Sequence, residues 1–298
     1  MYKKIILIGL LSCTLAVQAA PNDATVTIQN DDLTSTVLKF TSSLKLRSSI
    51  AMIYDEQGQS SLYTKNVDMV APIASITKLM TAMVVLDAKL PMEEEISISA
   101  LDMDMLKGTR SRMSPGMKLT RGELLKLALM SSENRAAAAL ARTYPGGTDA
   151  AVAMMNSKAR ELGMKDTRFL DPTGLNSGNV STAQDLVKMV QAAQRYEPIH
   201  EFTTTSSHVV DLAGRRPMRY SNTNPLVKNA SWDIGVSKTG YISEAGRCLV
   251  MQVKINQRPV VIVLLDSWGL RTRIGDANRI KKWMESAYAR STHVTRRS

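Results

Sequence analysis

Alternating hydrophobic and polar residues predict β-strands near the start of the chain and again near its end. Residues 49–54 and 61–64 have this alternation and flank a turn that contains Gly58, so we expect a β-hairpin there. Three further strand patterns lie towards the C-terminus, at residues 233–238, 247–255 and 259–265. The last two are joined by a short turn at residues 256–257, which predicts a second hairpin.

The middle of the chain repeats its hydrophobic residues at helical spacing instead. Residues 76–90 are apolar almost all round, which is typical of a helix in the centre of a domain rather than on its surface. Further helices are predicted at residues 120–130, 134–142, 148–162, 181–196 and 273–289. The last of these has one apolar face, which suits packing against a sheet and would also allow attachment to a membrane surface.

These patterns predict one domain, residues 20–298, with a helical lobe of about residues 76–225 inserted between the first hairpin and the last three strands. Residues 1–19 are predicted to be a cleaved signal peptide, because Lys3 and Lys4 precede an apolar run that ends near Ala19. That run is too short to span a membrane, and no later run is long enough, so no transmembrane segment is expected. Cys13 leaves a lipoprotein signal as the alternative.

The composition narrows the choice of partners. The formal net charge is +11, and only 5% of the residues are aromatic. Without a Gly-rich phosphate loop, a zinc-ligand spacing or an arginine-rich tract, nucleic acid is not expected as a partner. The positive charge favours either weak association with an anionic wall polymer or lipid surface, or solubility alone. After loss of Cys13, Cys248 has no internal disulfide partner, and we expect it to be a buried, inert thiol.

The first candidate site residues are Ser75 and Lys78, in the sequence SITK at the start of the apolar helix. Residues three apart on a helix share a face, so the Lys78 amine should lie beside the Ser75 hydroxyl. Burial would lower the pKa of Lys78 and let it take the serine proton, which makes Ser75 a nucleophile. A second S-x-x-K match at residues 42–45 lies in a weakly patterned segment and is expected to be solvated surface.

Ser132 and Asn134, in the sequence SEN, follow a predicted helix at a helix-to-helix junction. Ser132 could pass a proton between Lys78 and a leaving amine, and Asn134 could hydrogen-bond to Lys78 and to a substrate amide. The alternative is that both residues cap helices, a common use of Ser and Asn. A second S-x-N match occurs at residues 177–179.

Lys238, Thr239 and Gly240 form the sequence KTG at the predicted end of an apolar strand. A Lys and Thr pair suits a substrate carboxylate beside the scissile bond, and Gly240 allows close approach of a substrate backbone. The backbone N–H of Tyr241, together with that of Ser75, is predicted to form an oxyanion hole. An exposed lysine before a turn glycine is the alternative interpretation.

These three motifs, in this order, and the segment 171–175 (DPTGL) resemble the penicillin-binding D-alanyl-D-alanine peptidases of the bacterial periplasm, over about residues 50–288. The resemblance implies a three-layer α/β fold of the serine β-lactamase and transpeptidase type, in which a mainly antiparallel sheet is flanked by helices. It also implies that Ser75 is acylated, that Lys78 activates it, that residues 177–179 are not the second motif, and that β-lactams trap the serine.

The resemblance favours a periplasmic D,D-endopeptidase that hydrolyses D-alanyl-diaminopimelate cross-links of peptidoglycan. The reason is that the length of the chain and the sequences of its motifs resemble those of the endopeptidase type. A D-alanyl-D-alanine carboxypeptidase is the alternative, since Lys238 and Thr239 serve both substrates equally. A class A β-lactamase is disfavoured because the region of Asp171 lacks the glutamate that activates the deacylating water. A non-catalytic wall-binding or sensory module is an alternative of another class. No cofactor and no metal are expected, since the three histidines lack zinc-site spacing.

Overall fold

The computed structural model describes residues 44–211 and 216–295, with the side chains of 291–295 left out. The predicted signal peptide, Cys13 and the first two residues of the S-x-x-K match at residues 42–45 lie outside the described residues. The main sheet has five antiparallel strands in the order β2-β1-β11-β10-β9. Its strands are β1 (Ile50–Asp55), β2 (Ser60–Lys65), β9 (Asp233–Ile242), β10 (Gly246–Ile255) and β11 (Arg258–Ser267). Strands from both ends of the chain therefore share one sheet, because β1 pairs with β11.

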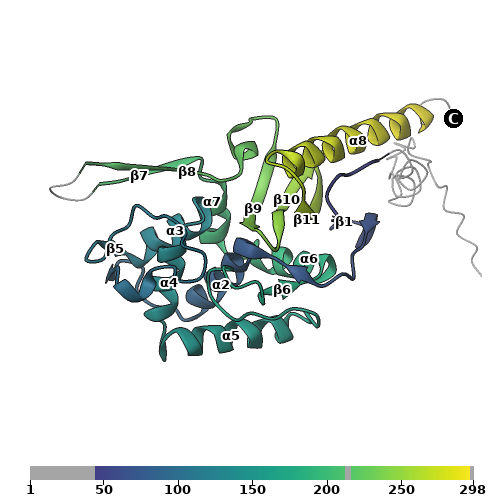
Figure 1. Ribbon diagram of the computed structural model, residues 1–298. Helices are drawn as coiled ribbons and strands as arrows, with labels where there is room; N and C mark the ends of the chain where they lie inside the picture. Colours follow the sequence, from purple (N-terminus) through teal and green to yellow (C-terminus); the bar gives the residue numbers. More distant parts are fainter. Residues whose placement is uncertain (1–43, 212–215, 296–298) are drawn as a thin grey trace, which may run out of the picture.

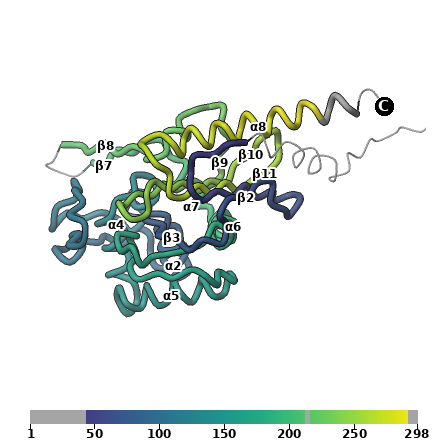
Figure 2. Tube along the Cα trace, turned by 45° about the vertical axis from the view of Figure 1, so that its right-hand side comes forward, coloured from purple at the N-terminus to yellow at the C-terminus, as the bar shows by residue number. Residues whose placement is uncertain are grey.

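Helices cover both faces of this sheet, so the predicted three-layer fold is confirmed (Figure 1). The α8 helix (Thr272–Thr295) runs along one face, as predicted for its apolar side, and the remaining helices lie on the other face (Figure 2). These are α2 (Lys78–Asp87), α3 (Arg121–Met130), α4 (Asn134–Arg142), α5 (Gly147–Glu161), α6 (Ala183–Ala193) and α7 (Glu197–Thr204).

Two hydrophobic cores follow from the alternation of side chains along the strands. Val261, Val263 and Leu265 of β11 pack in the larger core with α2 and α6, whereas Val260, Ile262 and Leu264 pack in the smaller core under α8. The α2 helix is buried from Lys78 to Val85, which confirms that the apolar helix lies in the middle of the molecule. Because α2 is surrounded by packed side chains, the residues at its start are held in a fixed position.

Short elements complete the structure. They are β3 (Ala71–Pro72), β4 (Glu95–Ser97), β5 (Lys118–Thr120), β6 (Val180–Ser181), β7 (Ser207–Val210), β8 (Met218–Ser221) and the 3₁₀ turns η2 (Ala74–Thr77), η3 (Ala100–Asp102) and η4 (Pro225–Lys228). The β7–β8 hairpin extends away from the body beside the helical side of the molecule (Figure 1). Neither this hairpin nor α7 is predicted from the sequence pattern.

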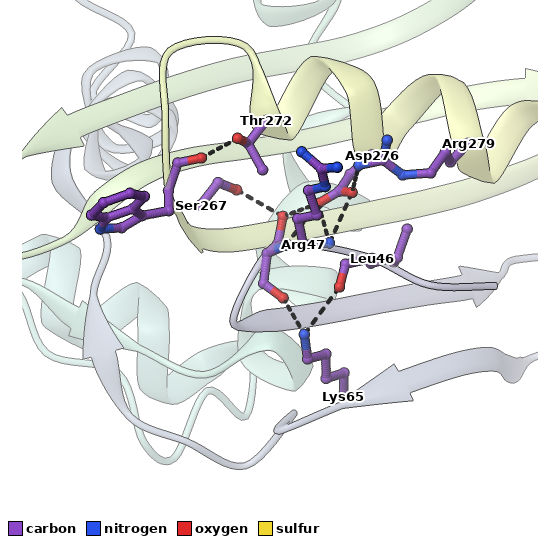
Figure 3. Close-up of polar contacts among 9 residues, drawn as sticks. Leu46, Arg47, Lys65, Ser267, Thr272, Asp276 and Arg279 are labelled. Atoms are coloured by element: carbon purple, nitrogen blue, oxygen red, sulfur yellow. Dashed lines mark hydrogen bonds and ion pairs between the residues drawn. The ribbon is translucent and has the colours of Figure 1, made fainter.

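The described start of the chain is tied to α8 by Asp276, which is fully buried. Its carboxylate accepts hydrogen bonds from the Ser48 amide at 2.8 Å and the Ser48 hydroxyl at 2.6 Å, and it pairs with Arg279 (Figure 3). Burial opposes ionisation of Asp276, but these donors hold its pKa below the usual range. Lys65, on the edge strand β2, donates to the Leu46 carbonyl at 3.1 Å, so polar contacts also join the described start of the chain to this edge of the sheet.

Candidate active site

Ser75 and Lys78 lie where the chain passes from a 3₁₀ turn into α2. Ser75 belongs to η2, and Lys78 is the first residue of α2. The Lys78 Nζ donates to the Ser75 Oγ at 2.8 Å, so the predicted contact between the amine and the hydroxyl is confirmed. Ala74, just before the serine, has a φ of 48°, a left-handed conformation that costs energy for a residue with a Cβ. The serine is thus presented on a sharp, well-supported turn.

Lys78 is almost fully buried, with 1% of its side chain exposed. Burial lowers its pKa from 10.5 to about 7, while the charges of Asp171, Glu133 and Asp104 oppose that shift. Its Nζ also donates to the Asn134 Oδ1 at 2.7 Å and to the Thr173 carbonyl at 2.6 Å. A lysine with this pKa is partly neutral near pH 7, which a proton acceptor for Ser75 requires.

The loop at residues 171–176 supplies the Thr173 carbonyl, a contact that the sequence analysis does not predict. Asp171 shapes this loop, since its carboxylate accepts from the amides of Thr173, Gly174 and Asn176 at 2.5–2.8 Å. Gly174 has a φ of 83°, and a Cβ there would lie 1.9 Å from the Ala74 carbonyl oxygen. A glycine is therefore required for the loop to press against the turn that carries Ser75.

The second S-x-N match, at residues 177–179, forms no described hydrogen bond with Lys78 or Lys238, but it has a structural role. Asn179 is fully buried, and its side chain accepts from the Leu170 amide at 2.7 Å and donates to the Thr77 Oγ1 at 3.1 Å. Its carbonyl accepts from the Ile73 amide at 3.0 Å. Asn179 therefore fastens the loop to the serine turn, which is a positioning role.

Ser132 and Asn134 lie at the junction between α3 and α4. Ser132 has a φ of 61°, and its Oγ accepts from the Lys238 Nζ at 2.8 Å. Asn134 is the first residue of α4 and donates from Nδ2 to the Thr109 Oγ1 at 3.0 Å. Neither side chain caps a helix, so the capping interpretation is wrong. Ser132 is hydrogen-bonded to Lys238, and no described hydrogen bond joins it to Lys78.

Lys238, Thr239 and Gly240 lie inside β9, which continues to Ile242. The prediction that the strand ends at Lys238 is wrong, because the ladder to β10 continues through Tyr241, which pairs with Arg247. A Cβ on Gly240 would lie 3.1 Å from the Ser75 amide nitrogen and 2.9 Å from the Ile73 carbonyl oxygen. The absence of a side chain at Gly240 thus lets β9 pass directly beside the serine turn.

Thr239 and Tyr241 occupy different surroundings on this edge strand. The Thr239 Oγ1 donates to the Thr223 Oγ1 at 2.6 Å. Tyr241 has an exposed side chain whose ring lies 4.4 Å from the Arg247 guanidinium. Its backbone follows Gly240, the residue that borders the Ser75 amide, and the pairing of the two N–H groups in an oxyanion hole stays a prediction.

Lys238 is as buried as Lys78, with 1% exposed, but its electrostatic neighbours differ. Burial lowers its pKa well below the ordinary value, and the charges of Lys78 and Arg273 lower it further. Besides Ser132, its Nζ donates to the Thr239 carbonyl at 3.0 Å. Because only positive charges act on Lys238, an anionic group bound beside it would stabilise its charged form.

Arg273, on α8, is a functional candidate that the sequence analysis misses. Its side chain is 8% exposed, and its Nε and Nη1 have no hydrogen-bond partner among the described residues. Two unpartnered donors on a buried guanidinium are costly unless a ligand can use them. The distance of Arg273 in sequence from the three motifs explains why no local pattern reveals it.

A loop at residues 104–109 closes the other side of the site. Asp104 accepts from the Leu106 amide at 2.8 Å and from the Thr109 Oγ1 at 2.7 Å, and Thr109 in turn holds Asn134. Lys107 of the same loop forms an ion pair with Glu244 in the turn after β9. The loop thus connects the SEN junction with the sheet.

Comparison with known proteins agrees with this geometry. A family model described as D-alanyl-D-alanine carboxypeptidase, peptidase S11, matches residues 37–268. The chain belongs to this peptidase family. The chain is 47% identical over 245 residues to a D-alanyl-D-alanine endopeptidase of Pseudomonas aeruginosa, which covers 81% of this chain and 78% of the relative. It is 44% identical over 243 residues to a D-alanyl-D-alanine endopeptidase of Escherichia coli, with the same coverage.

Solved structures confirm the fold of this S11 peptidase. The Streptomyces K15 DD-transpeptidase superposes with a TM-score of 0.75 at 28% identity, covering 81% of this chain and 98% of that one. Penicillin-binding protein D2 of Listeria monocytogenes, in its ampicillin-bound form, gives a TM-score of 0.71 at 27% identity, covering 81% and 98%. The resemblance to penicillin-binding D,D-peptidases predicted from the three motifs is therefore confirmed.

Other expectations concern chemistry outside this site. Cys248 is fully buried, and burial raises the pKa of its thiol to about 12, which confirms an inert cysteine. Within residues 44–211 and 216–290, no group of three His, Cys, Asp or Glu side chains could hold a metal ion. In the same part of the chain, no helix combines the length and the apolarity that crossing a membrane requires.

Proposed function

We propose that this S11 peptidase is a serine D,D-endopeptidase that cuts D-alanyl-diaminopimelate cross-links of peptidoglycan through an acyl-enzyme, and that β-lactams inhibit it. The observation that carries the proposal is the 2.8 Å contact between the Ser75 hydroxyl and a buried lysine whose pKa is lowered to about 7. The endopeptidase names of the relatives at 47% and 44% identity favour a cross-link over a free D-Ala-D-Ala end.

In the first step, neutral Lys78 accepts the Ser75 proton while Oγ attacks the carbonyl carbon of the D-Ala residue. A neutral amine keeps two N–H groups, which match the Asn134 Oδ1 and the Thr173 carbonyl, and its lone pair then faces the serine. The backbone N–H groups of Ser75 and Tyr241 hold the negative oxygen of the tetrahedral intermediate.

In the second step, the C–N bond breaks, and the leaving nitrogen takes a proton from Ser132. The proton that Lys78 took from Ser75 replaces the proton that Ser132 gives up, which leaves Lys78 neutral, while Lys238 holds the Ser132 Oγ by a hydrogen bond. Lys238 and Thr239 hold the carboxylate beside the scissile bond, and Arg273 adds its unpartnered donors on the same side. In the last step, Lys78 takes a proton from water as the water oxygen attacks the ester carbon, and this proton passes to the Ser75 Oγ as the bond between that oxygen and the acyl carbon breaks.

The location and domain assignments belong to the same proposal. The apolar run before Ala19 supports export by a cleaved signal peptide and a periplasmic enzyme, with residues 20–298 as one catalytic domain. The net charge of +11 supports weak association with the anionic wall or membrane surface. A wall-binding module without turnover remains the competing function, and only product release distinguishes it.

The test is digestion of purified cross-linked muropeptides with the wild-type protein and with Ser75→Ala. We expect the wild-type protein to convert dimers to monomers, and Ser75→Ala to lose both this activity and labelling by fluorescent penicillin. Release of D-Ala from pentapeptides with intact dimers would identify a carboxypeptidase, and labelling without any release would identify the binding module. Labelling of Ser75→Ala at the wild-type rate would refute the nucleophile.

A further inference from the structure

A second cleft adjoins the site at Ser132 and is not needed for the chemistry of acylation. It has a volume of about 430 Å³ and lies between the segment of Arg110 and Arg112, the SEN junction and strand β8. Ser131 and Glu133, the residues on either side of Ser132 in the sequence, line it, so the cleft lies next to the SEN junction.

The cleft lies on the side of the site where the leaving group is held. Ser132 is hydrogen-bonded to Lys238, and Thr239 to Thr223, so the carboxylate-binding residues border the segment that follows β8. The Thr223 amide donates to the Met130 carbonyl at 3.1 Å, which joins that segment to the SEN junction. The segment after β8 therefore contacts both the carboxylate-binding residues and the SEN junction, whose neighbours line the cleft.

Two arginines give this cleft a positive wall. Arg112 is held in place, since its guanidinium lies 4.0 Å from the Tyr220 ring centre and its Nη1 donates to the Arg219 carbonyl at 2.8 Å. This leaves other N–H groups of Arg112 free to bind a ligand. Arg110 is exposed and forms no ion pair or hydrogen bond with another described residue. A fixed and an unpaired guanidinium on one wall suit a carboxylate.

Tyr220 supplies an independent sign of a ligand. Its side chain is 2% exposed, yet its hydroxyl has no hydrogen-bond partner in the part of the chain that the structure describes. A buried hydroxyl without a partner costs about 1–3 kcal/mol, and a phenylalanine would avoid that cost. Because Tyr220 lines the cleft, a bound acceptor would give the hydroxyl its partner.

Glu133 determines the orientation of the ligand. Glu133 adjoins Ser132 in the sequence and lines the cleft, and its carboxylate repels another carboxylate near it. An anionic group therefore lies farther along, beside Arg110 and Arg112, while the amide groups of a peptide pass Glu133. This order fits a chain that carries a second carboxylate some distance from the scissile bond.

We propose that this cleft binds the peptide that leaves when a cross-link is cut, with a carboxylate of that peptide on Arg110 and Arg112 and an acceptor group on the Tyr220 hydroxyl. The proposal rests on the endopeptidase function. A free D-alanine ends beside Lys238 and does not reach the cleft, whereas the second stem peptide continues beyond it. The cleft thus selects cross-linked substrate over a free D-Ala-D-Ala end.

The experiment measures kcat/KM on a cross-linked muropeptide dimer and on a pentapeptide monomer for wild-type, Arg110→Ala, Arg110→Glu and Tyr220→Phe proteins. We expect Arg110→Glu to lower the ratio of dimer to monomer kcat/KM by roughly tenfold, the loss typical of one charge-assisted hydrogen bond, and Arg110→Ala and Tyr220→Phe to lower it less. A dimer whose distal carboxylates on the leaving peptide are amidated should show no difference between the wild-type and the Arg110 variants.

Arg160→Ala is the matched control, since Arg160 is exposed on α5, away from the cleft. Wild-type protein that cuts the dimer, with an unchanged ratio in Arg110→Glu, would overturn this inference alone. Equal losses on dimer and monomer would also overturn it, since they would indicate damage to the SEN junction. Wild-type protein that releases D-Ala but leaves the dimer intact would overturn the endopeptidase function and this inference together.

Discussion

The surroundings of Lys78 and Lys238 differ in charge, although both lysines are almost fully buried within one site. Three carboxylates, on Asp171, Glu133 and Asp104, act on Lys78 and oppose the effect of burial. Lys238 has no such carboxylate among the groups that shift its pKa, and Lys78 and Arg273 lower that pKa further. The same side chain is therefore prepared for two different tasks by its neighbours.

The two lysines also differ in the hydrogen-bond acceptors and negative charges that they have in the absence of substrate. Lys78 has three acceptors for its N–H groups and nearby negative charge, so both of its protonation states are accommodated and it can exchange a proton. Lys238 has two acceptors, the Ser132 Oγ and the Thr239 carbonyl. A substrate carboxylate supplies the missing negative charge and makes the charged form of Lys238 favourable.

The largest effect is expected from removing the proton acceptor. Lys78→Met should lower the second-order rate of acylation by benzylpenicillin by about 10²–10⁴-fold, because Ser75 then keeps its proton. Stopped-flow measurement or intact-mass spectra of the adduct will check this. A fall of less than about tenfold would mean that another group takes the proton.

Thermal unfolding shows whether that variant is folded. The pKa of Lys78 is about 7 in the folded state and 10.5 unfolded, so between these values the unfolded state binds more protons and stability rises with pH. Lys78→Met removes this cost, and its Tm should exceed that of wild type at pH 7, with a smaller excess at pH 10. Lys254→Met, at an exposed position on β10, should show no such pH dependence.

An intermediate effect is expected at the other lysine. Lys238→Ala should lower kcat/KM for a peptide with a free carboxylate beside the scissile bond by about tenfold or more, and lower it less for the amidated peptide. The reason is that Lys238 contributes charge to binding, whereas Lys78 acts on every substrate. Equal losses on both peptides would contradict the carboxylate role and support a role through Ser132 alone.

The parts of this site that the sequence predicts are those set by local geometry. Ser75 and Lys78 are three residues apart, so helical spacing alone brings them together. Gly240 is predicted to allow a substrate backbone to approach the strand closely. In the structure, the turn that carries Ser75 approaches Gly240 closely. The end of β9 was harder to predict, because Gly240 resembles a strand terminator when it in fact lies inside a ladder with β10.

The unpredicted parts depend on contacts between distant segments. The Thr173 carbonyl reaches Lys78 across 95 residues, and no side-chain pattern marks a backbone acceptor. Arg273 is one basic residue among many on the final helix until the fold brings it near Lys238. The α7 helix escaped prediction because Pro198 lies at its start and threonines at its end, although proline is well tolerated in a first turn.

The smallest expected effect tests whether the neighbouring carboxylates keep the pKa of Lys78 from falling below about 7. Acylation requires neutral Lys78, so its rate should rise with pH through about 7 and then level off. Glu133→Gln removes one charge that raises the pKa of Lys78, and the midpoint of the pH profile should move to lower pH, with faster acylation at pH 6. The measurement is the second-order rate constant with benzylpenicillin from pH 5 to pH 9.

Glu161→Gln, at an exposed position at the end of α5, should leave the midpoint in place. A midpoint that moves upward, or that moves equally in both variants, would show that the charge around Lys78 does not set its pKa, and the contrast with Lys238 would then rest on burial and hydrogen bonding alone.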